Sequence, residues 1–421
     1  MKTLKCISAA TASRRGPGPA KEDFPMCRLQ LFAVTVLSLL VALPAVPVRA
    51  EESKDASKPA APSLSDVLAA SGITLSGYAD LSYEHLDGEG LFVSGAPTRT
   101  FDDRKDSFSL HQLAVAIAYQ PKQGFGAVVN LIAGQDPDVF APYDINPGAH
   151  SKFDFPQAYV QYASGAWTVI AGRYVTLAGS ESIDPRSNTN FSRSILFGNA
   201  IPFAHTGVRA TYAASDQLSL VFGVNNGWDD LRDTNSAKTA ELAVLYTPIK
   251  AVSLTAQGYF GKERVGGLVG FGPEGMRKLI DIVATWSVTD AFSLGLNYDW
   301  ARQEGTANSG LTAANADTAR WNGVAAYVNY QFSDQWRVSV RAEYFDDQDG
   351  YRTGIVQKWK EGTVTVGYAP AKSVELRLEA RADKSDGSVF LQSFATDPVT
   401  DALTDTSDHQ TSIALEALYK F

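Results

Sequence analysis

Residues 373–386 read SVELRLEARADKSD, and apolar and charged side chains alternate along them. Successive side chains of a β-strand point to opposite faces of the sheet. One face of this stretch is therefore apolar and the other is charged, with Val374, Leu376, Leu378, Ala380 and Ala382 opposed to Glu375, Arg377, Glu379, Arg381 and Asp383. Turning such a strand over in a membrane would cost about 2–4 kcal/mol for each basic side chain near the middle. Because that total rivals the stability of a domain, about 5–15 kcal/mol, the pattern fixes which face meets water.

The same alternation recurs along the chain from Ile73 onward, where no convincing helix is found. The gaps between the segments alternate between tight turns, such as Ser164-Gly165, and longer polar stretches. Short turns at one end and long loops at the other are typical of bacterial outer-membrane barrels. We therefore predict an all-β fold, a closed antiparallel transmembrane β-barrel of about 16 strands with short periplasmic turns and long extracellular loops. The predicted strands are 73–86, 108–120, 124–135, 156–163, 166–175, 205–213, 217–226, 238–247, 251–261, 277–287, 291–303, 320–332, 335–347, 358–369, 373–386 and 409–421.

A soluble secreted all-β protein is the alternative, because its strands also have one apolar face each. The aromatic residues favour the barrel, since many lie close to tight turns, where amphipathic rings would meet lipid headgroups. These are Tyr119, Phe125, Tyr162, Trp167, Tyr212, Tyr246, Trp286, Phe292, Phe332, Trp336, Tyr368 and Phe421. A second group, nearer the other strand ends, comprises Trp228, Phe260, Trp300, Trp321, Tyr344 and Trp359.

The chain ends in TSIALEALYKF, residues 411–421, with an unbroken apolar stripe that finishes at Phe421. The last strand has to pair with the first, because an open sheet edge in lipid leaves backbone groups unsatisfied at several kcal/mol each. We expect the stripe to face outer-membrane lipid and Phe421 to lie at the membrane interface. A terminal phenylalanine behind such a stripe also resembles the signal that the barrel assembly machinery recognises.

The N-terminal region predicts export. Residues 31–43 (LFAVTVLSLLVAL) are apolar, Arg28 precedes them and Val48-Arg49-Ala50 follows, which is the order of a secretory signal. Thirteen apolar residues are fewer than the roughly 20 that a membrane-spanning helix needs. We predict a signal peptide over residues 1–50, whose true start could be Met26. A periplasmic linker with one or two helical turns then covers 51–71, and the barrel covers 72–421.

Charge and composition exclude several functions. Without residues 1–50, the 37 basic and 46 acidic residues fall by seven and two to 30 and 44, a net charge of −14, so nucleic acid is not expected as a partner. Residues 270–275 (GFGPEG) match GxGxxG, but they lie in a predicted loop rather than between a strand and a helix. The five histidines show no metal-ligand spacing. We predict no cofactor, no metal site and no catalytic residue.

An enzyme at the external rim is a functional alternative. Asp-Asp and Asp-His pairs hydrolyse peptides in some barrels, and Asp229-Asp230 and Asp408-His409 both fall at predicted external strand ends. Acidic loops also produce such pairs freely, as at Asp102-Asp103. We therefore predict that the protein is not an enzyme. A barrel with a rim hydrolase or adhesin role and no open pore is the other interpretation.

Inward arginines are the candidate pore residues. Arg337 and Arg341 stand four residues apart, and so do Arg377 and Arg381. In one interpretation, wall carboxylates neutralise these arginines. In the other, the arginines face acidic groups across a constriction and select solutes. The acidic groups could come from the loop at 176–204, because long loops in compact proteins tend to be functional, and we expect this loop to fold into the lumen and narrow it. Arg173 is assigned to the lumen because lipid exposure would be costly. The candidate residues are Arg173, Arg209, Arg337, Arg341, Arg377, Arg381, Glu181, Asp184 and Arg193.

Three stretches resemble the β-barrel porin family described as OmpL-like: 76–84 (SGYADLSYE), 171–181 (AGRYVTLAGSE) and 190–212 (NFSRSILFGNAIPFAHTGVRATY). The similarity runs from about residue 72 to the end and implies an outer-membrane barrel with passive transport, without naming catalytic residues or a substrate. Sixteen strands are wide enough to leave an aqueous channel. The predicted function is an outer-membrane porin for passive diffusion of small hydrophilic solutes and ions, and the barrel width is compatible with a homotrimer.

Overall fold

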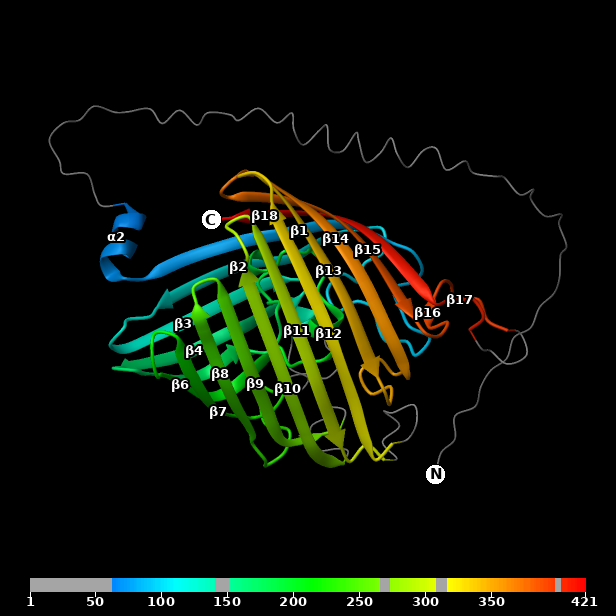
Figure 1. Ribbon diagram of the computed structural model, residues 1–421, viewed down its shortest axis with the longest axis horizontal. Coiled ribbons are helices and arrows are strands. Elements are labelled where there is room, and N and C mark those ends of the chain that lie inside the picture. The colour runs from blue at the N-terminus through cyan, green and yellow to red at the C-terminus, as the bar shows by residue number, and fades with distance from the viewer. Residues whose placement is uncertain (1–62, 141–150, 266–272, 308–315, 398–402) are drawn as a thin grey trace, which may run out of the picture. The chain divides into compact units, whose positions relative to one another are not determined.

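The computed structural model describes residues 63–140, 151–265, 273–307, 316–397 and 403–421. Sixteen strands close into one antiparallel barrel in which each strand pairs with its neighbours in sequence and β1 closes on β18 (Figure 1). This confirms the predicted fold class and strand count. The predicted signal peptide at 1–50 and the linker residues 51–62 lie outside the described residues. None of the described helices is long and apolar enough to cross a membrane.

The strands agree with the predicted segments to within three residues at every end. They are β1 (Thr74–Leu86), β2 (Ser107–Tyr119), β3 (Gly124–Gly134), β4 (Phe153–Ser164), β5 (Trp167–Val175), β6 (Ala204–Ala213), β7 (Leu218–Asn225), β8 (Thr239–Ile249), β9 (Val252–Arg264), β10 (Glu274–Ser287), β11 (Phe292–Glu304), β12 (Thr318–Gln331), β13 (Trp336–Asp347), β14 (Gln357–Ala371), β15 (Val374–Ser385) and β18 (His409–Lys420).

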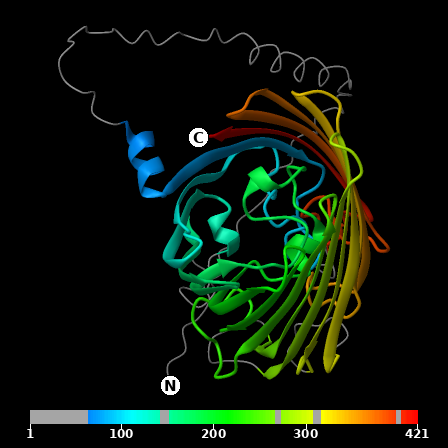
Figure 2. The ribbon, with the colours of Figure 1, turned by 60° about the vertical axis from the view of Figure 1, so that its left-hand side comes forward.

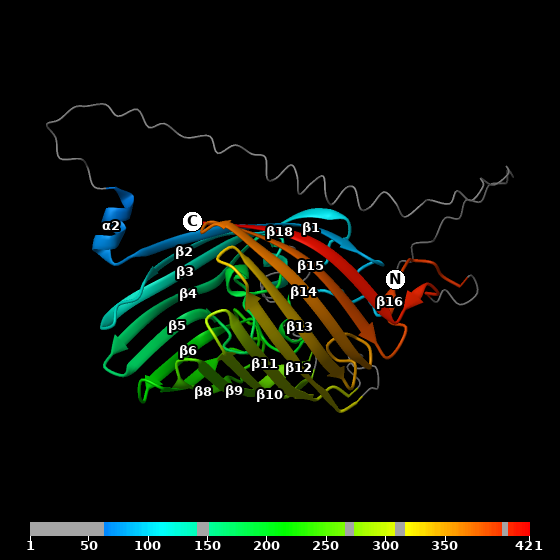
Figure 3. The same ribbon diagram turned by 45° about the horizontal axis from the view of Figure 1, so that its top comes forward.

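The two faces of the strands are used as the alternation predicted. In β15, Leu378 is 53% exposed on the outside of the protein, whereas the neighbouring Arg377 is 1% exposed inside it. At the tight turns, outward aromatic rings pack in cross-strand pairs, with Trp167 and Tyr212 4.7 Å apart and Trp336 and Tyr368 4.4 Å apart. Such paired rings suit the headgroup level of a membrane and mark the end of the barrel that holds the C-terminus, opposite β16 (Figure 3).

The barrel closes at the C-terminus. The amide of Gly77 donates to the carbonyl oxygen of Phe421 at 2.9 Å, and the amide of Phe421 donates back to Gly77 at 3.0 Å. The ring of Phe421 lies directly over Gly77, where an added Cβ would be 2.2 Å from a ring atom and 2.7 Å from the carbonyl oxygen of Ala114. A residue without a side chain is therefore needed beside the terminal ring. The two hydrogen bonds between Gly77 and Phe421 leave no strand edge open here.

Several short elements depart from the expectation that no helix follows Ile73. α3 (Pro137–Phe140), the 3₁₀ turn η1 (Pro185–Ser187) and α4 (Ile195–Asn199) all lie between strands. Side-chain caps rather than apolar periodicity set two of them, since Asp184 caps η1 and Ser194 caps α4. Before β1, α2 (Leu64–Ser71) occupies the stretch where helical turns were expected. A small hairpin of β16 (Phe390–Leu391) and β17 (Thr406–Ser407) follows β15.

The lumen near the long loops contains an apolar core. Phe92, from the loop after β1, packs 5.1 Å from Trp359 and 5.5 Å from Phe390. Trp228, Trp321 and Trp359 of the second aromatic group are buried in this core. The sequence placed these three tryptophans at the external strand ends; the structure shows that they point inward there, because the loops fold back over the barrel and bury them.

Candidate functional site

The lumen is occupied by residues 176–203, which connect β5 to β6 and which we call the lumenal segment. Its green trace, with a short helix, lies inside the ring of strands (Figure 2). Ile195, Leu196 and Phe197 of α4 are buried in the apolar core. The loop that was expected to fold inward therefore does so.

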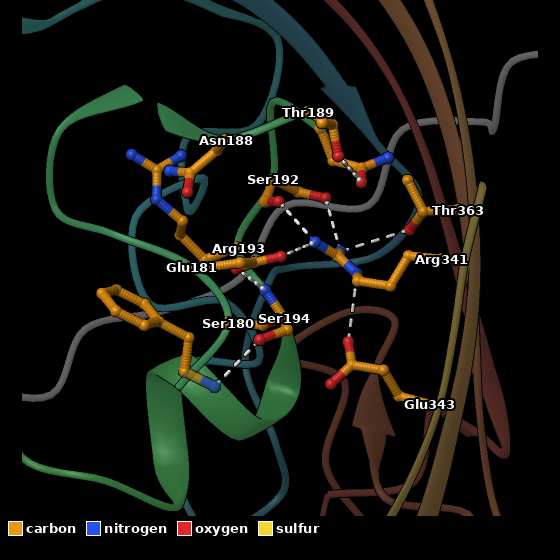
Figure 4. A network of polar contacts seen from close by, with 12 residues as sticks. Ser180, Glu181, Asn188, Thr189, Ser192, Arg193, Ser194, Arg341, Glu343 and Thr363 are labelled. Atoms are coloured by element: carbon orange, nitrogen blue, oxygen red, sulfur yellow. Dashed lines mark hydrogen bonds and ion pairs between the residues drawn. The ribbon is translucent and has the colours of Figure 1, made fainter. Parts of the chain in front are cut away.

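Arg341 on β13 is the centre of the attachment (Figure 4). Its guanidinium donates to Glu181 of the lumenal segment at 2.8 Å, to the carbonyl oxygen of Ser192 at 2.7 Å and to Glu361 on β14 at 2.8 Å. Glu343 lies 3.1 Å away. The arginine side chain is completely buried. A planar guanidinium with five donors is suited to join a loop to a wall in this way.

Three further arginines of the same wall bind backbone carbonyl groups of the lumenal segment. Arg337 donates to Thr189 at 2.6 Å, Arg377 to Pro185 at 3.2 Å and Arg381 to Arg193 at 2.8 Å. Their charges are matched by wall carboxylates: Glu375 contacts Arg337 and Arg377, Asp383 contacts Arg381, and Glu416 contacts Arg377. Each of these three arginine charges is thus paired with a carboxylate, which is required to offset the desolvation of the arginine.

Carboxylates of the wall hold the backbone amides of the lumenal segment. Glu379 accepts hydrogen bonds from Phe191 at 2.7 Å and Ser192 at 2.9 Å. Glu343 accepts from Ile195 at 3.0 Å and Leu196 at 3.1 Å, at the start of α4. Hydrogen bonds to an ionised acceptor are stronger than neutral ones, so the Glu379 carboxylate adds to the attachment that the arginines provide.

The first arm of the lumenal segment is held by β10 and β11. Gly179 donates to Asp281 at 3.1 Å, and Ser180 donates to Asn297 at 3.2 Å. Asp281 stands directly opposite Asp299 in the strand register. Both carboxylates are buried, and the oxygens of Asp299 have no hydrogen-bond partner within the described part of the chain. This arm therefore combines attachment with two facing acidic groups.

The remaining candidate residues are also bound, three of them in ion pairs and Arg193 to backbone carbonyl groups. Arg209 contacts Glu241 at 2.8 Å, and Arg173 binds Asp154 through two bonds of 2.8 and 3.0 Å. Asp184 pairs with Arg186 within the lumenal segment at 2.7 Å. Arg193 donates to carbonyl groups of its own segment, including that of Phe191 at 2.8 Å.

This geometry corrects one expectation. The arginines of β13–β15 do not face the acids of the loop across an open gap, because Arg341 and Glu181 are in direct contact and buried. The inward-facing loop packs against the basic strip instead of standing opposite it. Sequence reasoning also missed Glu361, Glu416 and Asp281, although they share the inward alternation of the arginines and could have been found by it.

Of the two pairs considered for a rim enzyme, Asp229-Asp230 is bound by neighbouring residues, whereas Asp408-His409 is exposed. Asp229 accepts hydrogen bonds from the amides of Phe203 at 2.6 Å and Ala204 at 3.0 Å, and burial raises its pKa. Burial and the nearby Glu263 raise the pKa of Asp230 to about 8. Asp408 and His409 are exposed neighbours 2.8 Å apart. Of the GxGxxG match, 270–272 lie outside the described residues, and its last two residues begin strand β10 rather than a helix.

A closed sixteen-strand barrel with an outward apolar face and a loop folded into its lumen defines an outer-membrane porin, an integral protein of the outer membrane. The model of the family described as "Putative beta-barrel porin-2, OmpL-like" matches residues 72–421, so the chain belongs to this family. Among curated protein sequences, none matches the chain.

Solved structures with the same fold are outer-membrane barrels. OmpT of Vibrio cholerae is 12% identical, covering 83% of this chain and 97% of its own, with a TM-score of 0.54. The outer-membrane channel DcaP of Acinetobacter baumannii is 13% identical over the same shares, with a TM-score of 0.54. The anion-selective porin from Comamonas acidovorans is 14% identical over 83% and 99%, with a TM-score of 0.55. These likenesses concern the fold alone.

Proposed function

We propose that this porin is a passive channel for small hydrophilic solutes and ions, driven by their concentration gradients. One observation carries the proposal: the lumenal segment is fixed to β9–β15 and β2 by buried bonds, while polar side chains on β4–β6, such as Thr168 and Thr211, remain partly exposed inside the barrel. A segment that narrows a lumen from one side, and is rigidly held there, is suited to a permanent aperture rather than to a seal.

In this proposal the arginine candidates act as anchors of the constriction. Arg337, Arg341, Arg377 and Arg381 hold the lumenal segment at a fixed distance from the opposite wall, and Glu181 completes the attachment. Asp184, Arg186 and Arg193 would shape the edge of the aperture. Arg209 and Arg173 would stiffen the opposite wall through their own pairs.

The proposal includes no enzymatic step. A rim hydrolase would need acidic groups free to activate water, whereas Asp229 is bonded to two backbone amides. We further propose export by the signal peptide at residues 1–50 and recognition by the barrel assembly machinery through Phe421. A homotrimer is proposed as the assembly, since one solved structure with this fold, OmpT of Vibrio cholerae, is described in a trimer form.

Single-channel recording of the purified, folded protein in a planar bilayer tests the proposal. We expect discrete and stable conductance steps. A variant that lacks residues 184–194 should conduct several-fold more, because the constriction is removed while the strands remain. Folding of both proteins is checked by heat-modifiable migration in gels. If well-folded protein gives no conductance steps, the proposed function is wrong and an unopened barrel is the better description.

A further inference from the structure

The wall made by β2–β8 offers no exposed charge to the lumen. The His, Asp, Glu, Lys and Arg residues of these strands, all of which are described, are each less than a tenth exposed. They are His111, Asp154, Arg173, His205, Arg209 and Glu241. Most are also engaged with a neighbour, as in the Arg209–Glu241 pair. A solute that moves along the lumenal side of these strands would therefore meet uncharged side chains.

Several of the neutral side chains that face the lumen here are polar. Tyr259 marks the lumenal face, because its hydroxyl contacts the amide of Leu177 in the lumenal segment and also Glu241, which pairs with Arg209. Thr211 lies two residues beyond Arg209 on the same face, and Thr168 pairs with Thr211 in register. Both threonines are partly exposed.

The next strand continues this neutral face. Gln161 is opposite Ile170, which is itself opposite Arg209, so it faces the lumen, and Tyr159 lies two residues before it. Gln120 donates to the Tyr159 hydroxyl at 3.3 Å and to Gln161 at 3.2 Å. Tyr159 and Gln120 are not buried. The wall therefore presents amide and hydroxyl groups that can both donate and accept hydrogen bonds.

On the lumenal segment, the partly exposed charges cancel each other. The side chains of Asp184 and Arg186 are 25% and 26% exposed and form an ion pair at 2.7 Å. The guanidinium of Arg186 also lies 4.5 Å from the ring centre of Tyr78. A solute between this segment and the neutral wall would meet a local dipole and no net charge.

We infer that solutes pass between the lumenal segment and β4–β6, and that this passage favours uncharged, hydroxyl-rich solutes such as monosaccharides and polyols over ions of the same size. The inference rests on the proposed channel function and specifies its substrate class. Pores select ions through rings of charged side chains or aligned dipoles, and this wall lacks exposed charges. Amide and hydroxyl groups can replace the water around a sugar hydroxyl, but they compensate poorly for a lost ionic hydration shell.

Liposome swelling with the full chain tests the solute class. We compare glucose with gluconate and glucosamine, which have similar sizes and opposite charges. Glucose should enter at least about threefold faster than either charged solute, and the potassium-to-chloride permeability ratio should lie near one. Faster entry of gluconate or glucosamine, or strong ion selectivity in either direction, would overturn the inference while leaving the channel function in place.

Charge insertion tests the route. Thr168→Lys and Thr211→Lys each add one positive charge to the neutral wall and should lower the potassium-to-chloride permeability ratio at least threefold. Asp216→Asn makes the same charge change in the exposed turn between β6 and β7 and should leave the ratio unchanged. Conducting lysine variants with wild-type ratios would place the route elsewhere and refute the inference. Absence of conductance in every protein, wild type included, would refute the proposed function, and the inference with it.

Discussion

The wall of β13–β15 and the wall of β4–β6 belong to one barrel, but they use polar residues in different ways. On the first wall, Arg341 and Glu379 are buried and form hydrogen bonds with the lumenal segment. On the second, Thr168 and Thr211 are partly exposed and Arg209 is paired with Glu241 on β8. The charged wall is thus the attachment surface, and in our proposal the neutral wall faces the solute.

The largest effect should follow from removing the centre of the attachment. Arg341→Met leaves Glu181 and Glu343 buried without their arginine, while Glu361 keeps Arg381, 3.5 Å away. Breaking a buried ion pair by removing one partner costs about 3–5 kcal/mol. We expect a large drop in the temperature of heat-modifiable unfolding and noisy conductance from a loosened segment.

Arg186→Met is the matched control for this change. Its pair with Asp184 is about one-quarter exposed, and exposed ion pairs contribute about 0–1 kcal/mol. If Arg341→Met unfolded at the same temperature as the Arg186→Met variant, the charged wall could not be the attachment surface, and the comparison of the two walls would fail.

A smaller effect should separate charge from hydrogen bonding on the charged wall. Glu379 accepts from two backbone amides and from Thr365, the last at 2.6 Å. Glu379→Gln keeps one acceptor but turns an amide group towards a donor, and hydrogen bonds to charged groups contribute about 1.5–3 kcal/mol against about 0.5–1.5 for neutral ones. We expect a loss of about 2 kcal/mol in thermal unfolding.

The corresponding change on the neutral wall is Gln161→Leu. It removes contacts of 3.2 Å to Gln120 and 3.4 Å to Pro121, which are long for hydrogen bonds. Stability should change by less than about 1 kcal/mol. Equal losses in both variants would show that the two walls do not differ in how tightly their polar groups are bound.

The sequence predicted the walls better than the interior. Strict alternation around Leu376, Arg377 and Leu378 fixed which side chains point inward, because each error in register would place charges in lipid. The contact between Arg341 and Glu181 was not predictable in this way. The wall arginines largely bind carbonyl oxygens of the lumenal segment, such as those of Thr189 and Arg193, and every residue type carries a carbonyl group. The path of a loop fixed through its backbone therefore leaves little trace in the pattern of side chains.

The inward orientation of the external tryptophans could not be predicted from the sequence for a related reason. Trp321 donates its indole N–H to the carbonyl oxygen of Ala200 at 3.0 Å, so its burial depends on where the lumenal segment ends. A tryptophan at a strand end suits a membrane interface equally well. Only the position of a segment about 120 residues away in the chain decides between the two environments, and local periodicity carries no information on it.

The last difference concerns pH and the loop that follows β7. On the charged wall the carboxylates lie beside arginines. Asp230 instead lies buried near Glu263, and its burial and the charge of Glu263 together raise the pKa of Asp230 to about 8. The folded protein then holds a proton that the unfolded chain releases near pH 4, so stability declines as pH rises from about 4 to 8. Asp230→Asn should remove this decline and raise thermal stability at pH 8.5 by at least about 1.4 kcal/mol, the equivalent of one pKa unit. At pH 4 the variant and the wild type should unfold at the same temperature. An equal shift at both pH values would mean that Asp230 acts through packing, and that carboxylates on the two sides of the barrel do not differ in how their charge is compensated.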